Sequence, residues 1–416
     1  MRSRTVHLWR ENSVTKDDMT RYRATIEAAG KKHDLWYGCA SEYAPYITSN
    51  MDPYLLASIF PAMQHGDQLV VHGPVSSRLL KNLERFQEIW AYWESDRYQK
   101  VEMWAEEELE PAPPVNDRAL VSFSGGVDSC FTVHRHLEGL CGRQTEEIGA
   151  ALMIHGFDIP LEMDDASSAA AESAKNLLAA RGVPLLRLSF NWRQIMDGLQ
   201  ICWEDSHGTA LIACLSLFQN GFGVGVLASS LEYDPLIPYG SSPLTDPLLS
   251  SDRFRIVHDG AHFPRLKKLP ALATWPKALD HLRVCWEHPE LAGNCCECEK
   301  CIRTMLGFRA VGMELPAAFP RDISDQQIRR IPLRTETAHH HFGLVRQEAI
   351  RAGMGNESWV SALTLAMERY ERGETPIMAL RRRLRLRTRV RSLVGASATS
   401  DEKRMGNQLA RVPDRD

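Results

Sequence analysis

The 416-residue sequence has no hydrophobic segment long enough to cross a bilayer. Its longest nearly apolar run, GFGVGVLASSL from Gly221, falls well short of the roughly 20 apolar residues that a membrane-spanning helix needs. The first residues, MRSRTVHLWRENS, lack the apolar stretch of a secretory signal. These absences predict a soluble, cytoplasmic protein without a membrane partner.

The sequence also has no excess of basic charge, because its 49 Lys and Arg are balanced by 53 Asp and Glu. Bulk charge therefore does not indicate nucleic-acid binding. The G-x-x-x-x-G-K-[ST] spacing of the common NTPase loop is missing. The stretch GFGVG at Gly221 precedes a predicted strand instead of following one, so it favours a turn over a dinucleotide fingerprint.

Cysteine is abundant, with ten residues, and without a secretion signal this indicates a reducing compartment where clustered thiols bind metal. Cys285 is followed by Cys295, Cys298 and Cys301 in C-x2-C-x2-C spacing. Four thiolates can close a tetrahedral zinc site, and a full set of protein ligands is typical of a structural metal. Cys296 is the spare cysteine, although the spacing also permits it to replace Cys295, and an iron–sulfur cluster is the alternative metal centre.

A short apolar run at residues 119–123 leads into a glycine turn and then into a predicted helix from Val127. Glycines allow backbone N–H groups to approach an anion closely, and a helix N-terminus adds the positive end of its dipole. This order predicts a phosphate-binding loop, made of Ser124, Gly125, Gly126, Val127, Asp128 and Ser129.

Strands and helices alternate after this loop, which predicts an α/β fold with a parallel sheet and helices on both faces. Ligands of such sheets bind at the carboxyl ends of the strands, where the glycine turn lies. The predicted strands are residues 119–123, 149–156, 183–190 and 224–230, and the predicted helices are residues 127–140, 164–182 and 207–221.

The region before the loop is predicted as an α+β accessory domain. The stretch DQLVVHG from Asp67 is strand-like, and an amphipathic helix follows it. The apolar face of this helix carries Leu79, Leu83, Phe86, Trp90 and Trp93.

Composition divides the chain into four parts. The acidic, proline-rich segment EEELEPAPPVND from Glu106 is interpreted as a linker, and the last residues have the composition of a disordered tail. The predicted parts are an N-terminal accessory domain (1–112), a nucleotide-binding domain with the cysteine cluster (117–320), a helical accessory region (321–392) and the tail (393–416).

The stretch SGGVDS resembles the PP-loop of the ATP pyrophosphatases, which cleave ATP between the α- and β-phosphates. The resemblance implies an adenine nucleotide α-hydrolase (HUP-like, Rossmann-like) fold, with ATP and Mg²⁺ as cofactors. It implies that the loop holds pyrophosphate, that Asp128 positions magnesium, and that basic side chains stabilise the leaving group. The implied catalytic residues are Asp128, Ser129 and Lys268; Arg265 and Lys267 are further basic candidates, and His155 joins the loop in nucleotide binding.

Within that family the order of the motifs resembles 7-cyano-7-deazaguanine synthase, which has a similar C-terminal zinc site followed by a basic residue and a GF-containing helix. Here Arg303 and LGFRAVG follow the cysteines, and the resemblance covers roughly residues 117–313. It implies that ATP activates a 7-carboxy-7-deazaguanine-type acid for amide or nitrile formation or for conjugation to nitrogen. The GRN and GYPDCR-like substrate segments of the family are missing, so the ATP half matches better than the substrate half. A nucleic-acid-modification or antiviral defence pathway is compatible with the resemblance.

Polar side chains that follow the predicted strands are candidates for substrate contact, although capping or surface roles explain each of them equally well. They are His155, Asp158, His207, Glu232, Tyr233, Asp234 and Asp246.

Two other functions are compatible with the sequence. A tRNA-thiolating enzyme would need a persulfide-carrying cysteine, and Cys130 and Cys202 lie near the loop but outside a thiolation motif. A non-catalytic nucleotide-binding protein would bind ATP without forming AMP. The N-terminal region is a candidate surface for a protein partner, and Arg381–Arg391 for nucleic acid or an acidic partner.

Overall fold

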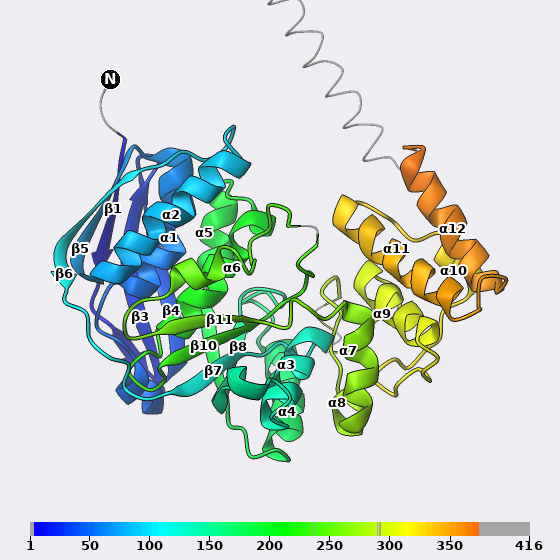
Figure 1. Cartoon of the computed structure of the whole chain (residues 1–416). Helices are drawn as coiled ribbons and strands as arrows, with labels where there is room; N and C mark the ends of the chain where they lie inside the picture. Colours follow the sequence, from blue (N-terminus) through cyan, green and yellow to red (C-terminus); the bar gives the residue numbers. More distant parts are fainter. Residues whose placement is uncertain (1–3, 235, 289, 291–292, 374–416) are drawn as a thin grey trace, which may run out of the picture. The chain divides into compact units, whose positions relative to one another are not determined.

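The computed structural model describes residues 4–234, 236–288, 290 and 293–373, and within them the chain has an α/β fold with a mostly parallel sheet (Figure 1). The strand order is β11-β10-β7-β8-β9-β4-β3-β1-β5-β6, with β2 paired to β3. The strands are β1 (Thr5–Arg10), β2 (Val14–Lys16), β3 (Met19–Ala28), β4 (Lys31–Ala40), β5 (Gln68–Ser76), β6 (Glu102–Leu109), β7 (Arg118–Ser122), β8 (Glu147–His155), β9 (Leu185–Phe190), β10 (Val224–Ala228) and β11 (Arg255–Asp259).

Strands β7 to β11 form a parallel layer that carries the glycine turn. Their apolar residues are buried on both sides of the layer, as parallel strands require. The helices α3 (Val127–Leu137) and α4 (Asp164–Ala179) lie on one face, and α5 (Trp192–Gly198) and α6 (Trp203–Ser216) lie on the other (Figure 1). The alternating strands and helices predicted for this region are confirmed, with ends that differ by up to several residues.

The N-terminal strands continue this layer instead of forming a sheet of their own. Strand β4 pairs antiparallel with β9, where Tyr37 lies opposite Phe190 and the two rings stack at 4.1 Å. The side chain of Asn191 accepts a hydrogen bond from the Trp36 amide at 2.8 Å and donates one to the Asp34 carbonyl at 2.7 Å. The hydrophobic core is therefore continuous across β4 and β9.

The helices α1 (Asp52–His65) and α2 (Ser77–Trp93) cover the N-terminal strands. The predicted apolar face of α2 is confirmed, because Leu79, Leu83, Phe86 and Trp90 are buried. Each such side chain stabilises the fold by about 1.5–3 kcal/mol through burial. Trp93 is partly buried against the same core.

The predicted linker begins too early in the sequence. Residues Glu106–Leu109 belong to β6, which pairs in parallel with β5 at the end of the sheet. The glutamate side chains of this strand are exposed, so their charge does not oppose pairing, and charges of this kind protect an edge strand from further association. Irregular chain from Glu110 to Asp117 then leads to β7.

Contacts divide the chain into two compact units. The first comprises Met1–Cys296 and Met313–Arg321 and includes the sheet, whereas the described part of the second comprises Glu297–Gly312 and residues 322–373. The division into residues 1–112 and 117–320 that the composition suggests stays a prediction. The remaining elements of the first unit are α7 (Arg265–Ala271), α8 (Pro276–Asp280) and the 3-10 turns η1 (Ser41–Tyr46), η2 (Gly142–Gln144), η3 (Asp246–Leu249) and η4 (Leu272–Thr274).

The second unit is helical, as the sequence predicts for the region after Arg321. Thr335 caps α11 by accepting a hydrogen bond from the Ala338 amide. The predicted arginine-rich segment Arg381–Arg391 and the predicted tail 393–416 lie outside the described residues. The helices of this unit are α9 (Glu299–Ala310), α10 (Asp325–Arg329), α11 (Glu336–Arg351) and α12 (Ser358–Glu371). Among the helices of the described chain, none combines the length and apolar character that a membrane crossing requires.

We expect Gly208→Ala in α6 to lower the free energy of unfolding by about 1–3 kcal/mol, because overpacking of a close contact costs energy of this order. A Cβ atom at Gly208 would lie 1.9 Å from the backbone oxygen of Gly240. Gly198→Ala is the matched control, since a Cβ atom there meets nothing within 4 Å. Urea unfolding of both variants measures the difference, and equal stabilities would contradict the packing described here.

Candidate functional site

The glycine loop, residues Ser124–Ser129, lies between the carboxyl end of β7 and the N-terminus of α3. Gly125 has a φ of +76°, a conformation that residues with a side chain rarely adopt. Gly126 is the N-cap of α3 and has an extended backbone, so the first amides of the helix are not used by a capping side chain. The loop therefore presents backbone donors at the positive end of a helix dipole.

Two hydroxyl groups organise the loop from within. The Ser124 Oγ accepts a hydrogen bond from the Gly126 amide at 3.3 Å, and the Ser129 Oγ donates to the Gly126 carbonyl at 3.1 Å. The two hydroxyl oxygens lie 3.4 Å apart. Val127 is fully buried beneath them and anchors the start of the helix in the core. The structure thus brings the six predicted loop residues together, and their binding of a nucleotide stays a prediction.

The carboxylate of Asp128 is held by two basic side chains of α7. Arg265 forms an ion pair with one carboxylate oxygen, and the Lys268 Nζ lies 2.9 Å from the other. The ammonium group of Lys268 also donates to the Ser229 carbonyl at 2.6 Å, and only 3 % of its side chain is exposed. A buried ammonium group of this kind needs a partner charge, which Asp128 provides. Lys267, on the same helix, is exposed.

A cavity of about 130 Å³ opens beside the glycine loop. It lies between the loop, α4 and the segment that follows α8, and polar as well as apolar side chains line it. Among these is Arg283, whose amide donates to the Gly125 carbonyl at 2.9 Å. The sequence does not predict a role for this residue. Its position two residues before Cys285 is the one available signal, and no neighbouring residue in the sequence links it to the glycine loop. The lining residues include Ser124, Gly125, Ala170, Ser173, Leu177, Asp280, His281 and Arg283.

His155, the predicted nucleotide ligand at the end of β8, has a role in the turn that follows this strand. Its Nε2 lies 2.8 Å from the Pro160 carbonyl and its Nδ1 lies 3.8 Å from an Asp164 carboxylate oxygen. The ring is buried and fixed by these two contacts. Its contact with a nucleotide stays a prediction, as does a substrate contact of the half-buried Asp158.

The other substrate candidates lie at two places in the fold. His207 is buried in α6, with its Nδ1 3.1 Å from the Trp203 carbonyl. Asp246 is completely buried and accepts hydrogen bonds from Ser241 and Ser242 as well as a contact of 2.8 Å from His258. The His207 ring also lies 4.8 Å from the ring of Tyr239, measured between centroids, so both residues contact the loop after β10. Glu232 accepts a hydrogen bond from the Arg265 amide, Tyr233 is half exposed, and Asp234 is exposed.

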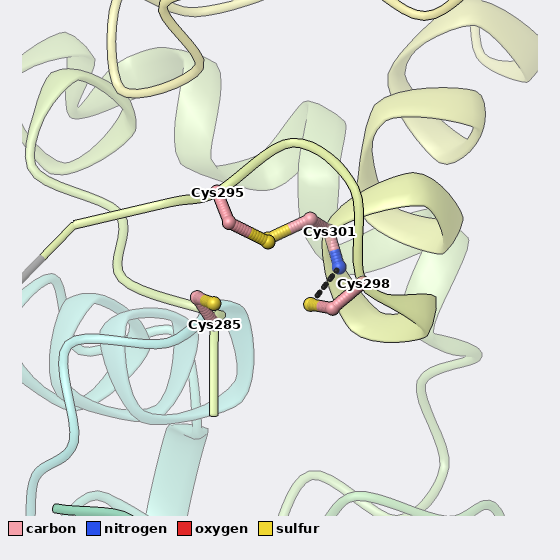
Figure 2. Close-up of side chains that lie close together, drawn as sticks. All are labelled: Cys285, Cys295, Cys298 and Cys301. Carbon is pink, nitrogen blue, oxygen red and sulfur yellow. Dashed lines mark hydrogen bonds between the residues drawn. The ribbon is translucent and has the colours of Figure 1, made fainter. Parts of the chain in front are cut away.

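The four predicted metal ligands gather into one buried cluster, shown in Figure 2. The sulfur atoms of Cys285, Cys295, Cys298 and Cys301 all lie within 4.8 Å of one another, and none of the four residues is more than 3 % exposed. A buried set of four sulfur donors could hold a metal ion. Cys298 is also the N-cap of α9, because its sulfur accepts the Cys301 amide at 3.5 Å.

The structure selects Cys295 over Cys296 as a member of this cluster. Cys296 has a φ of +61°, in the left-handed region, and it is not one of the four residues whose sulfur atoms come together. Burial raises the pKa of the Cys296 thiol. Asn294 supports the backbone at Cys285, since its Oδ1 accepts hydrogen bonds from the amides of Val284 and Cys285.

All ten cysteines lie in the described residues, and none of them forms a disulfide. Cys130, in the first turns of α3, is completely buried, and this burial raises the pKa of its thiol. The thiolate form that nucleophilic sulfur chemistry requires is therefore disfavoured at this position. A second group of three side chains, His136, Cys141 and Asp259, has the proximity of metal ligands, but the Asp259 carboxylate already pairs with Arg135 at 3.1 Å.

Comparison of the chain with family models, curated proteins and solved structures gives no match. The geometry of the glycine loop and of the cysteine cluster therefore carries the argument about function.

We expect the purified chain to contain one metal ion and Cys298→Ser to lose most of it, because three thiolates hold a metal much less tightly than four. Serine preserves the N-cap of α9, so the loss would report the missing sulfur ligand and not a frayed helix. Cys296→Ser is the control and should retain the ion. Elemental analysis of the proteins measures the content; equal losses in the two variants would contradict the assignment of ligands.

Proposed function

We propose that the protein is an ATP-dependent enzyme of the PP-loop ATP pyrophosphatase type, which forms AMP and pyrophosphate while it activates a carboxylate. The observation that carries the proposal is the glycine loop at the carboxyl end of β7, with a left-handed Gly125 and a helix N-terminus behind it. Parallel sheets bind ligands at this edge, and a loop of this form is suited to phosphate groups.

The proposed reaction has two steps, adenylation of the carboxylate and transfer of the acyl group to nitrogen. A carboxylate oxygen attacks the α-phosphorus of ATP, the bond from this phosphorus to the bridging oxygen breaks, and pyrophosphate leaves with the electron pair. A nitrogen nucleophile then attacks the acyl carbon, AMP leaves, and the nitrogen loses a proton to solvent or to a base. The energy of ATP is thereby used to replace a carboxylate oxygen by nitrogen.

The residues of the loop fit the phosphate groups of such a substrate. The amides that follow Gly125 would donate to phosphate oxygens, together with the hydroxyls of Ser124 and Ser129. The ammonium group of Lys268 and the guanidinium group of Arg265 lie beside the loop and would neutralise negative charge that grows on the leaving pyrophosphate. These roles agree with the expectation that basic groups converge on the loop from another element.

We propose that magnesium binds together with the nucleotide and has no separate site formed by protein side chains alone. Both carboxylate oxygens of Asp128 are engaged by Arg265 and Lys268, so this carboxylate does not form a ready-made magnesium site. Protein-bound magnesium usually keeps several waters and is shared with substrate phosphates. A role of Asp128 toward the ion would therefore require its ion pairs to rearrange when the nucleotide binds.

The metal proposed for the cysteine cluster is zinc. Four sulfur donors around one buried point match the tetrahedral coordination of Zn²⁺, and a site with four protein ligands has no open position for a substrate. The ion would thus stabilise the segment around Cys285 and Cys295 and take no part in the reaction.

The substrate class proposed is a 7-carboxy-7-deazaguanine-type acid, with ammonia or an amine of a partner protein as the nitrogen nucleophile. The support is the order of the two motifs along the chain, the glycine loop before the four cysteines, which resembles that of 7-cyano-7-deazaguanine synthase. A reducing cytoplasm would suit the cluster of thiolates. Thiolation of tRNA has less support, because Cys130 is buried and its thiol pKa is raised.

We expect AMP release when the protein is incubated with ATP, Mg²⁺, 7-carboxy-7-deazaguanine and ammonia, measured by chromatography of the nucleotides. Asp128→Asn should lower turnover by about a hundredfold or more, because it removes the charge that holds Arg265 and Lys268 at the loop. Asp17→Asn, a change of an exposed side chain in the N-terminal hairpin, should have no effect.

Three results would separate the alternatives. Absence of AMP with this acid, but release with another carboxylate, would overturn the substrate class alone. Binding of ATP without AMP in the presence of every acid and nucleophile tested would favour a nucleotide-binding protein over an enzyme. Full turnover by Asp128→Asn would contradict the assignment of the loop.

The identity of the metal gives an independent prediction. We expect zinc, a colourless protein and no labile sulfide, because a redox-inactive ion is sufficient for a structural site. Absorption spectra and elemental analysis of protein purified without oxygen measure this. Iron together with labile sulfide would contradict the zinc assignment and would favour a thiolating enzyme.

A further inference from the structure

Strand β6 is an edge of the sheet. It pairs with β5 on one side, and within the described residues no strand pairs with its other side. The amide of Glu102 donates to the Asp67 carbonyl at 3.2 Å, so this amide faces β5. Because successive amides of a strand point to opposite sides, the amides of Met103 and Ala105 face away from β5. An edge of this kind can pair with a further extended segment.

The side chains of β6 form two rows of different character, because they alternate between the two faces of the strand. One row is acidic and contains a tryptophan whose side chain is 55 % exposed. The other row is mostly apolar and partly or fully buried, apart from one exposed glutamate. The first row consists of Glu102, Trp104, Glu106 and Glu108, and the second of Met103, Ala105, Glu107 and Leu109.

The negative charge of β6 is not balanced by neighbouring basic side chains. Glu102 accepts a hydrogen bond at 3.1 Å from Gln68, which is neutral. The carboxylates of Glu106, Glu107 and Glu108 are exposed and form no ion pair within the described part of the chain. Pairing of two β6 edges from two copies of the protein would bring like charges together, which is unfavourable. The edge is therefore suited to a segment with positive charge.

Residues 384–391 have the complementary pattern. They lie outside the described residues, and their sequence, LRLRTRVR, alternates arginine with leucine, threonine or valine. In an extended conformation this sequence would carry its arginines on one face and its leucines, threonine and valine on the other. Since β6 has the same period of two, the arginines would lie against the acidic row and the aliphatic side chains beside Met103 and Ala105.

Trp104 adds a contact that favours arginine. A guanidinium group stacks on an indole ring and is attracted by its electrons. The same sheet contains an example on two other strands, where the guanidinium carbon of Arg21 lies 4.3 Å from the centroid of the Trp36 ring. The exposed ring of Trp104 offers the same surface at the edge.

We propose that the edge of β6 binds residues 384–391 of this chain as an added strand. Main-chain hydrogen bonds to β6 would hold the segment, and the pairing of arginine with glutamate would determine which of its faces meets the acidic row. This inference is independent of the proposed function, because it concerns the edge of the sheet and not the glycine loop.

The test is hydrogen exchange of the full chain, with mass spectrometry of the peptide that covers residues 102–109. A variant with serine at the four alternating arginines should exchange about tenfold faster at this peptide than the parent chain, because edge amides without a partner are open to water. The peptide that covers β11, the strand at the other end of the sheet, is the control and should exchange equally in both chains. The changes are Arg385→Ser, Arg387→Ser, Arg389→Ser and Arg391→Ser.

A synthetic peptide of residues 381–391 gives a second arm. Added to the serine variant, it should restore slow exchange of β6, and concentrated salt should reverse this effect because the charges are exposed. A peptide with glutamine in place of every arginine should have no effect. Equal protection by the two peptides would contradict pairing through charge.

Charge reversal separates recognition from a loss of strand stability. Glu106→Arg combined with Glu108→Arg should accelerate exchange of β6, since the edge then repels the arginine segment. Glutamate at the four arginine positions, added to this variant, should restore slow exchange. A β6 strand that had merely become unstable would not be repaired by changes in another segment, so a failure of this restoration would count against the proposal.

Equal exchange of β6 in the parent chain and in the serine variant would overturn the proposal. If the serine variant also lost binding of single-stranded RNA that the parent chain showed, the arginines would be assigned to nucleic acid instead. AMP formation, measured in the same preparations, should be equal in the parent chain and the serine variant. The outcome for the edge of β6 is therefore separate from the outcome for the glycine loop.

Discussion

A backbone turn without a side chain, at Gly125, is the constraint on which the candidate site depends. Because this residue adopts a φ of +76°, the chain can leave β7, turn sharply and begin α3 with its amides directed outward. Arg283 packs beside this turn, and its amide donates a hydrogen bond to the Gly125 carbonyl. The segment that contains Arg283 continues to Cys285. The Oδ1 of Asn294 accepts hydrogen bonds from the amides of Val284 and Cys285. One backbone hydrogen bond and the side chain of Asn294 thus connect the loop, the segment around Arg283 and Cys285 of the cysteine cluster.

Several charged side chains lie around the glycine loop, and most of them are positive. Arg265, Lys268 and Arg283 contribute three positive charges around the loop, and Asp128 and Asp280 contribute negative ones. The side chain of Lys268 is almost fully buried, so solvent screens its charge less. Its electrostatic interaction with a nearby charge is therefore stronger than that of a surface lysine. The ion pairs of Asp128 with Arg265 and Lys268 place two of these charges on α7, directly beside the start of α3.

Local sequence patterns predict the strands, the glycine loop and the spacing of the cysteines, because each is determined by neighbouring residues. The composition of the acidic stretch from Glu106 predicts a linker, yet strand pairing with β5 decides the structure of residues 106–109. Arg283 could not be found, since its contact with Gly125 joins distant parts of the chain. Likewise, the choice between Cys295 and Cys296 depends on the backbone of Cys296, which the spacing of sulfur atoms does not reveal. The ion pairs of Asp128 and the buried position of Asp246 are tertiary features of the same kind.

The antiparallel pairing of β4 with β9 has a consequence for the stability of the part of the chain that carries the glycine loop. If the chain began at Asp117, strand β9 would lose its neighbour, and a row of amide and carbonyl groups beside Leu188 would be left open to water or to another chain. The stacked ring of Phe190 would also become accessible. The N-terminal strands therefore protect the edge of β9, and a protein shortened in this way would be prone to self-association through that edge.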